Sequence, residues 1–204
     1  MSKNVIVVAH ADDEAIWCSS LPLRYDGVWT VICCSTPVKG PERATVEFFK
    51  SCRVIGANGI LITGITDKGK DDPLDESLYP RIAPHLHGAD VIFTHNEDGE
   101  YGHIHHKAVH QYIKKNFSTL QQVNYFGYSS THEFPGLAHR GSVDWFSHEL
   151  SAEEENRKSE ALKCYKHIER TKPYYNSIHN WLTKLPRYNI HRESFYGIQP
   201  RQIL

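Results

Sequence analysis

The sequence predicts an α/β fold, with a Rossmann-like, mainly parallel sheet and helices on both faces. Three observations support this prediction. Short apolar segments recur along the chain, segments of helical period separate them, and polar stretches directly follow two of the apolar segments. Strands that alternate with helices at this spacing are typical of βαβ units, whose parallel strands are buried on both faces.

Five short apolar segments predict the strands. They are residues 4–9, 28–34, 60–63, 91–94 and 123–128. The first, NVIVVA, is the clearest, because it is continuous and β-branched and polar residues follow it at once.

Five segments with helical features predict the helices. They are residues 15–23, 42–57, 77–86, 104–117 and 151–168. Pro22 is expected to interrupt the first and Gly56 to end the second, whereas two prolines disfavour the third. Ser151 and Glu154 form a capping-box pattern at the start of the last. Loops are expected at residues 37–41, 66–76 and 95–102, and the final segment has no regular pattern.

Length and composition fit one globular domain over residues 1–204, with no linker, repeat or low-complexity tract. The formal net charge of -1 gives no electrostatic footprint for nucleic acid or an anionic membrane, so neither is expected as a partner. The N-terminal apolar run is too short for a signal peptide, and no run approaches the ~18 apolar residues of a membrane span.

Cysteine usage favours a reducing, cytoplasmic location. The chain has five cysteines, an odd number, and no CxxC pair, which argues against a disulfide framework. The sequence leaves the oligomeric state open, and a homo-oligomer remains possible.

Two polar constellations follow predicted strands. Residues 10–14 (HADDE) follow the first strand, and the histidine-rich residues 94–106 follow the fourth. Ligands of open α/β sheets bind outside the carboxyl ends of the strands, so the two stretches can converge. Two histidines and a carboxylate form a catalytic zinc set, and a spare aspartate can act as base. Plainer interpretations stay open: the aspartates as helix caps and the histidines as a solvated helix start.

These stretches resemble the signatures of the LmbE-like (PIG-L) zinc deacetylases. Residues 10–14 resemble the AHPDDE signature, and residues 101–106 (YGHIHH) resemble the YGHPDH signature. Between them, residues 43–47 resemble the family's helix with an Arg and a Glu, and residues 158–165 resemble its late helix. The signatures occur in the family's order, and the resemblance extends over most of the chain.

The resemblance implies that His10, Asp13 and His106 bind zinc. It also implies that Asp12 is the general base that activates the metal-bound water. The same ligand set accepts Fe2+, Co2+ or Mn2+, so the native metal stays open.

The resemblance further implies that His103 stabilises the oxyanion and protonates the leaving amine, that Tyr101 assists at the oxyanion, and that Arg43 contacts substrate hydroxyls. The implied activity is hydrolysis of an acetyl group from an N-acetylated amine, expected to be an N-acetylglucosamine-containing small molecule. Two alternatives stay open. One is another N-acyl substrate, such as a modified nucleotide or an antibiotic precursor, and the other is a non-catalytic sugar-binding protein.

The sequence departs from the family at His105, where the signature has an Asp that tunes the preceding histidine. Without that carboxylate the pKa of His103 is expected to fall, unless Glu97, Asp98 or Glu100 substitutes.

Four further residues have two interpretations each. Glu14 is expected to hydrogen-bond a metal ligand. His95 is expected to be structural, with contact to metal or substrate as the alternative. His132 and His139 are expected in a solvated loop, with a place in the pocket as the alternative.

Overall fold

The computed structural model describes residues 1–69, 72–118, 121–127, 145–166 and 192–196. Predictions for His132, His139, residue 128 and residues 167–168 lie outside these ranges. A single domain over residues 1–204 stays a prediction.

Strands and helices alternate along most of the described chain. The strands are β1 (Lys3–Val8), β2 (Val28–Cys33), β3 (Thr36–Pro37), β4 (Asn58–Leu61), β5 (Thr66–Asp67), β6 (Val91–Thr94), β7 (Gln122–Phe126), β8 (Trp145–Glu149) and β9 (Arg192–Tyr196). The helices are α1 (Asp13–Trp17), α2 (Leu21–Arg24), α3 (Pro41–Ile55), the 3-10 turn η1 (Glu76–Leu78), α4 (Tyr79–Leu86), α5 (Gly99–Gly102), α6 (Ile104–Phe117) and α7 (Ala152–Lys163).

The strand order of the main sheet is β4-β2-β1-β6-β7-β9-β8, in which β1 is the middle one of the five parallel strands. The first five strands of that order are parallel, and β9 pairs antiparallel with both β7 and β8. The chain passes from β1 to β2 on one side and later to β6 on the other. The carboxyl ends of β1 and β6 therefore form a topological switch point, where open α/β sheets bind ligands.

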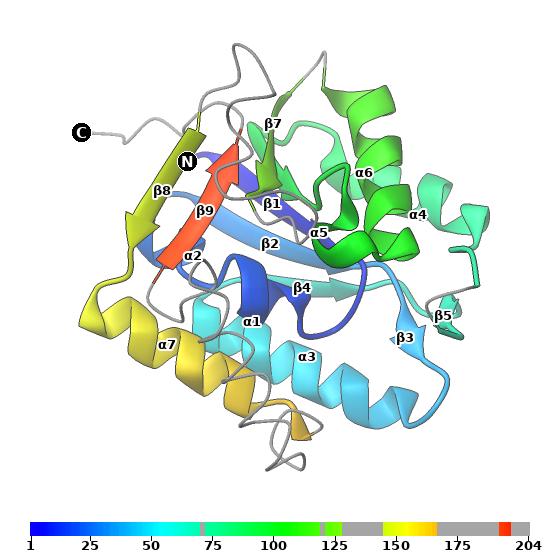
Figure 1. Cartoon of the computed structure of the whole chain (residues 1–204), viewed down its shortest axis with the longest axis horizontal. Helices are drawn as coiled ribbons and strands as arrows, with labels where there is room; N and C mark the ends of the chain where they lie inside the picture. The colour runs from blue at the N-terminus through cyan, green and yellow to red at the C-terminus, as the bar shows by residue number, and fades with distance from the viewer. Residues whose placement is uncertain (70–71, 119–120, 128–144, 167–191, 197–204) are drawn as a thin grey trace.

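Alternate residues of β1 face two separate cores, as the pleat of a strand requires. Ile6 and Val8 pack in a cluster with residues of α1, α3 and α7. Val5 and Val7 pack in a second cluster with residues of α4 and α6. Figure 1 shows α3 and α7 side by side below the sheet, and α4 and α6 together on the other side. The predicted α/β fold, mainly parallel with helices on both faces, is confirmed.

The prediction of one helix over residues 15–23 is wrong. The chain instead forms α1 and α2, and the break lies at residues 18–20. Pro22 lies in the first turn of α2, where its missing N–H would have no helical partner anyway. The proline therefore follows the break and does not cause it.

The strand predicted at residues 60–63 begins earlier, as β4. A Cβ at Gly59 would lie 2.9 Å from the ring of Phe49 and 3.1 Å from that of Phe48. Glycine at this position therefore lets α3 pack closely on β4. The helix ends at Gly56 as predicted, and Gly56 adopts a left-handed conformation with φ 84.

A small parallel pair, β3 with β5, was not predicted from the sequence. β5 lies in the loop predicted at residues 66–76, and β3 overlaps the start of the loop predicted at residues 37–41. Two-residue strands have no periodicity to detect. The pair places Asp67 at the pocket described below. In the described residues, every helix is too short or too polar to traverse a lipid bilayer.

The start of α7 is held by the predicted capping box. Ser151 Oγ accepts from the Glu154 backbone amide, and the Glu154 side chain accepts from the Ser151 amide. Arg24 of α2 also donates two hydrogen bonds to the Glu154 carboxylate, at 2.9 and 2.6 Å. One buried carboxylate therefore caps α7 and joins it to α2.

Replacing Glu154 tests this joint. Glu154→Ala removes the side-chain half of the capping box and leaves the Arg24 guanidinium with the Glu149 carbonyl but no carboxylate partner, so the free energy of unfolding should fall by about 1–3 kcal/mol. Glu153→Ala is the matched control on the same turn, because the Glu153 side chain is 72% exposed and its loss should cost less than ~0.5 kcal/mol. Urea titration measures the free energy of unfolding of both variants. Equal losses would contradict the proposed contribution of Glu154 to the contact between α7 and α2.

Candidate functional site

Three of the side chains singled out in the sequence meet at the switch point. His10 lies two residues beyond β1, Asp13 begins α1, and His106 lies in the first turn of α6. The Nε2 of His106 is 3.2 Å from the Nδ1 of His10. The Asp13 Oδ2 is 3.4 Å from His10 Nδ1 and 3.5 Å from His106 Nε2. Asp13 and His106 are buried and His10 is partly exposed.

These three atoms fit a divalent cation. Ligand atoms about 2.0–2.1 Å from a tetrahedral metal lie roughly 3.3–3.4 Å from one another. The observed separations of 3.2, 3.4 and 3.5 Å match this spacing. The other carboxylate oxygen of Asp13 accepts from the Trp17 indole at 3.0 Å, which fixes the side chain. The donor set and its spacing therefore suit zinc or a similar ion.

A buried carboxylate, Glu100, orients His106. The Nδ1 of His106 lies 2.5 Å from Glu100 Oε2, so a proton on Nδ1 leaves the lone pair on Nε2 for a metal. Burial opposes the charge of Glu100, but His95 and His106 outweigh it and lower its pKa to about 2. Glu100 has φ 56, a strained value for a residue with a side chain. The sequence had suggested Glu100 only as a partner of His103.

Both ring nitrogens of His95 contact protein groups. Its Nδ1 lies 2.9 Å from Glu100 Oε2, and its Nε2 accepts from the Ala9 amide at 2.9 Å. An amide N–H can donate only to a nitrogen that keeps its lone pair, so the proton of His95 lies on Nδ1. Both nitrogens are thereby engaged, although Nε2 also lies 3.4 Å from Asp13 Oδ2.

Asp12 lines the pocket from a strained turn, with φ 126. The Glu14 carboxylate accepts from the Asp12 amide at 3.2 Å and from the hydroxyls of Ser51 and Tyr165. Glu14 therefore holds the backbone of Asp12, whereas the sequence analysis expected it to contact a metal ligand. Burial raises the pKa of Glu14 to about 7, although the bonds from Ser51 and Tyr165 favour its charged form.

His103 has a low basicity. Burial, and after it electrostatic repulsion from the neighbouring His10, His106 and His105, lower its pKa to about 3. The direction is the one expected from the sequence, but the causes are burial and the neighbouring histidines. The Nδ1 of His103 accepts from the His105 amide at 3.3 Å, so the neutral ring carries its proton on Nε2. His103 is therefore a neutral hydrogen-bond donor toward the pocket.

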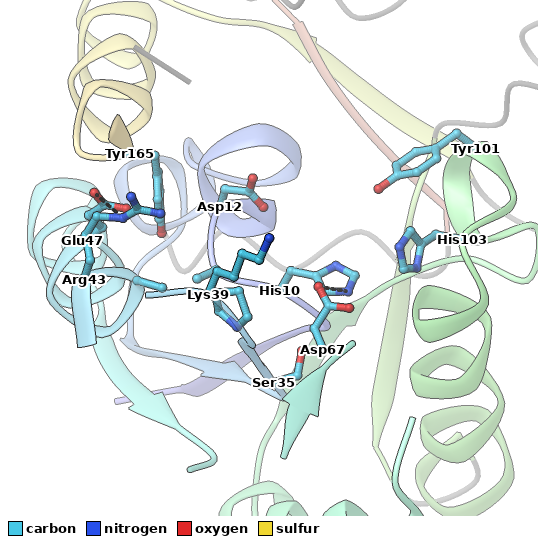
Figure 2. Close-up of a pocket in the computed structure, with 13 residues that line it drawn as sticks. His10, Asp12, Ser35, Lys39, Arg43, Glu47, Asp67, Tyr101, His103 and Tyr165 are labelled. Atoms are coloured by element: carbon cyan, nitrogen blue, oxygen red, sulfur yellow. Dashed lines mark ion pairs between the residues drawn. The ribbon is translucent and has the colours of Figure 1, made fainter. Parts of the chain in front are cut away.

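A pocket of about 390 Å³ is lined by five of the predicted site residues, namely His10, Asp12, Arg43, Tyr101 and His103. Figure 2 shows Tyr101 and His103 on one side of it, Arg43 and Tyr165 on the other, and Asp12 between them. Tyr101 is 44% exposed and lies within ring contact of His103, at a centroid distance of 5.7 Å. Arg43 pairs with the pocket carboxylate of Glu47, Nε to Oε1 at 3.6 Å.

Several pocket residues were missed in the sequence. Lys39, Asp67, Ser35 and Tyr165 all line the pocket. Asp67 lies in a segment expected to be a polar loop, and Tyr165 follows the end of α7. These residues are far from the two motifs in the sequence, so no local pattern could link them to the site. Only the folded sheet brings the segments together.

The fold and the cluster define an α/β protein with a metal-capable histidine–carboxylate centre at the switch point of its sheet. Residues 5–117 match the sequence profile of the PIG-L family, described as GlcNAc-PI de-N-acetylase. The chain belongs to this family of deacetylases. A search of curated proteins found no match.

Solved structures share the fold at low sequence identity. The A40926 pseudoaglycone deacetylase Dbv21 superposes with a TM-score of 0.65 at 12% identity, over 96% of both chains. The 4-carboxy-2-hydroxymuconate hydratase GalB of Pseudomonas putida has a TM-score of 0.63 at 15% identity, over 100% of this chain and 99% of that one. The N,N'-diacetylchitobiose deacetylase of Pyrococcus horikoshii has a TM-score of 0.58 at 12% identity, over 97% and 84%.

The raised pKa of Glu14 makes the stability pH-dependent. The folded chain holds the Glu14 proton up to about pH 7, whereas the unfolded chain releases it near 4.5. The stabilisation from this group is therefore complete below about pH 4.5 and is lost as the pH rises through 7. Denaturant titrations of Glu14→Gln should show a smaller loss of stability between pH 5 and 8 than the wild type.

The exposed Glu160→Gln, on α7, is the control and should follow the wild-type curve. If the curves of Glu14→Gln and the wild type ran parallel across this range, Glu14 would not be the group that titrates.

Proposed function

We propose that the chain is a zinc-dependent deacetylase that hydrolyses the acetyl group of an N-acetylated amine. The observation that carries this proposal is the convergence of His10, Asp13 and His106 on one point beside Asp12. Membership of the PIG-L family supports the reaction, and the donor set supports zinc, with Fe2+ as the alternative.

His10, Asp13 and His106 would hold the ion. When bound, it would polarise the acyl carbonyl and lower the pKa of a coordinated water toward about 7. Glu100 holds His106 in the tautomer that this role needs.

Asp12 is the proposed base. Its side chain lies in the pocket beside His10, and the hydrogen bond to Glu14 holds its backbone. The Asp12 carboxylate is thus held near the proposed metal position, and it is not one of the three proposed ligands. Asp12 takes a proton from the attacking water and can pass it to the leaving amine. The low pKa of His103 favours Asp12 over His103 for that second step.

His103 and Tyr101 are the proposed oxyanion donors. The Nε2–H of neutral His103 and the hydroxyl of Tyr101 can donate to the oxygen on which negative charge develops. The exposure of Tyr101 leaves it room to move as substrate enters.

The pocket suits a polar substrate, which we propose is an N-acetylglucosamine-containing small molecule. Arg43 and Lys39 line one wall and can donate to hydroxyls or to an acidic group. Five cysteines without disulfides favour a cytoplasmic location for the reaction.

Metal analysis combined with acetate release tests the function. The purified chain should contain close to one divalent ion, release acetate from members of an N-acetylglucosamine panel, lose this activity with a chelator and recover it with zinc. A second panel of other N-acyl amines separates the alternative substrates. Bound metal without hydrolysis of any amide would contradict deacetylation. Hydration of an unsaturated acid such as the GalB substrate would indicate a hydratase instead.

Asp12→Asn tests the base. The amide cannot accept a proton from water, so kcat should fall by roughly 10²–10⁴-fold while the metal content stays unchanged. The surface variant Asp26→Asn is the control and should keep wild-type activity. Near-full activity of Asp12→Asn on a competent substrate would assign the base to another group.

A further inference from the structure

A second imidazole, that of His105, lies behind His10, on the side away from the proposed metal position. We propose that His105 is a positioning residue that fixes the tautomer of His10, so that Nδ1 of His10 offers its lone pair to the metal. The inference rests on the proposed metal site. The family resemblance connected position 105 only with His103, whereas this inference gives His105 a role toward His10.

The chain of hydrogen bonds begins at a backbone carbonyl. The Nε2 of His105 lies 2.6 Å from the carbonyl oxygen of Asp72. A carbonyl oxygen only accepts, so Nε2 of His105 carries a proton. In the neutral ring, Nδ1 of His105 therefore keeps its lone pair.

That lone pair faces His10. The Nδ1 of His105 lies 2.9 Å from Nε2 of His10, so Nε2 of His10 must donate. The proton of His10 is thus held on Nε2, and its Nδ1 is left unprotonated. This same Nδ1 lies 3.2 Å from His106 Nε2 and 3.4 Å from Asp13 Oδ2.

Asp67 is not the hydrogen-bond acceptor for Nε2 of His10. Its carboxylate oxygens lie 4.0 Å from Nε2 of His10 and 3.8 Å from Nδ1 of His105, beyond hydrogen-bond distance. His105 is only 1% exposed and lies in the first turn of α6, next to His106. One helical turn therefore supplies both a proposed ligand, His106, and the group that orients His10 in the loop after β1.

Two variants separate the two nitrogens of His105. His105→Asn can place an amide oxygen where Nδ1 stood, which keeps an acceptor for His10 and gives up the bond to Asp72. His105→Gln can reach the Asp72 carbonyl but has no acceptor at the Nδ1 position. Zinc affinity is measured by competition with a chelator, with thermal unfolding of the metal-free proteins as a check on folding.

The proposal expects His105→Gln to bind zinc about 10–100-fold more weakly than the wild type and His105→Asn to remain close to it. Equal affinities for all three proteins, equal losses in both variants, or a larger loss in His105→Asn would overturn it. If the wild type itself bound no divalent ion, the proposed function would fail first, and the two failures are thereby distinguished.

A measurement on the unaltered protein does not depend on how the variants fold. Long-range ¹H–¹⁵N spectra of the zinc-loaded, ¹⁵N-histidine-labelled chain report which ring nitrogen carries the proton. The expected result is a proton on Nε2 of both His10 and His105 and metal on Nδ1 of His10. Metal on Nε2 of His10, or a proton on its Nδ1, would overturn the assignment.

Discussion

The buried carboxylate of Glu100 is the interaction on which the site depends. It accepts from His106 on α6, from His95 at the end of β6 and from the Asn96 amide. His95 in turn accepts from the amide of Ala9, the residue before His10. The charge of Glu100 therefore helps to position both His106 and, through His95 and Ala9, the segment that carries His10. The strained backbone conformation of Glu100 is maintained because these three hydrogen bonds compensate for its cost.

Three buried carboxylates near the pocket have different roles because their partners differ. Glu100 is paired with histidines and stays charged, with a pKa of about 2. Glu14 is surrounded by hydroxyls and an amide, which do not neutralise its charge, and its pKa rises to about 7. Asp13 presents one oxygen to His10 and His106 and secures the other on an indole. The fold thus distinguishes chemically identical groups by what they touch.

The sequence predicted the five parallel strands and the converging cluster because both depend on local patterns, but it did not predict the antiparallel additions β9 and β8. Apolar runs mark the central strands, and polar stretches after β1 and β6 mark the switch point. The two-residue strands and the small displacement of β4 were not predictable, because long-range pairing and the packing of Gly59 on α3 decide them. The roles of Glu14 and His105 were also out of reach, since each depends on a hydrogen bond to a residue from a distant segment.

The two histidines that meet at the centre are 96 residues apart in the chain. An ion shared between them would act as a cross-link, closing a loop of nearly half the polypeptide. Closing so long a loop removes much of the freedom of the unfolded chain, and the loss grows only slowly with further length. In a chain whose cysteines form no disulfide, the metal would then link the start of the sheet to α6 and would stabilise the folded chain as well as serve the chemistry.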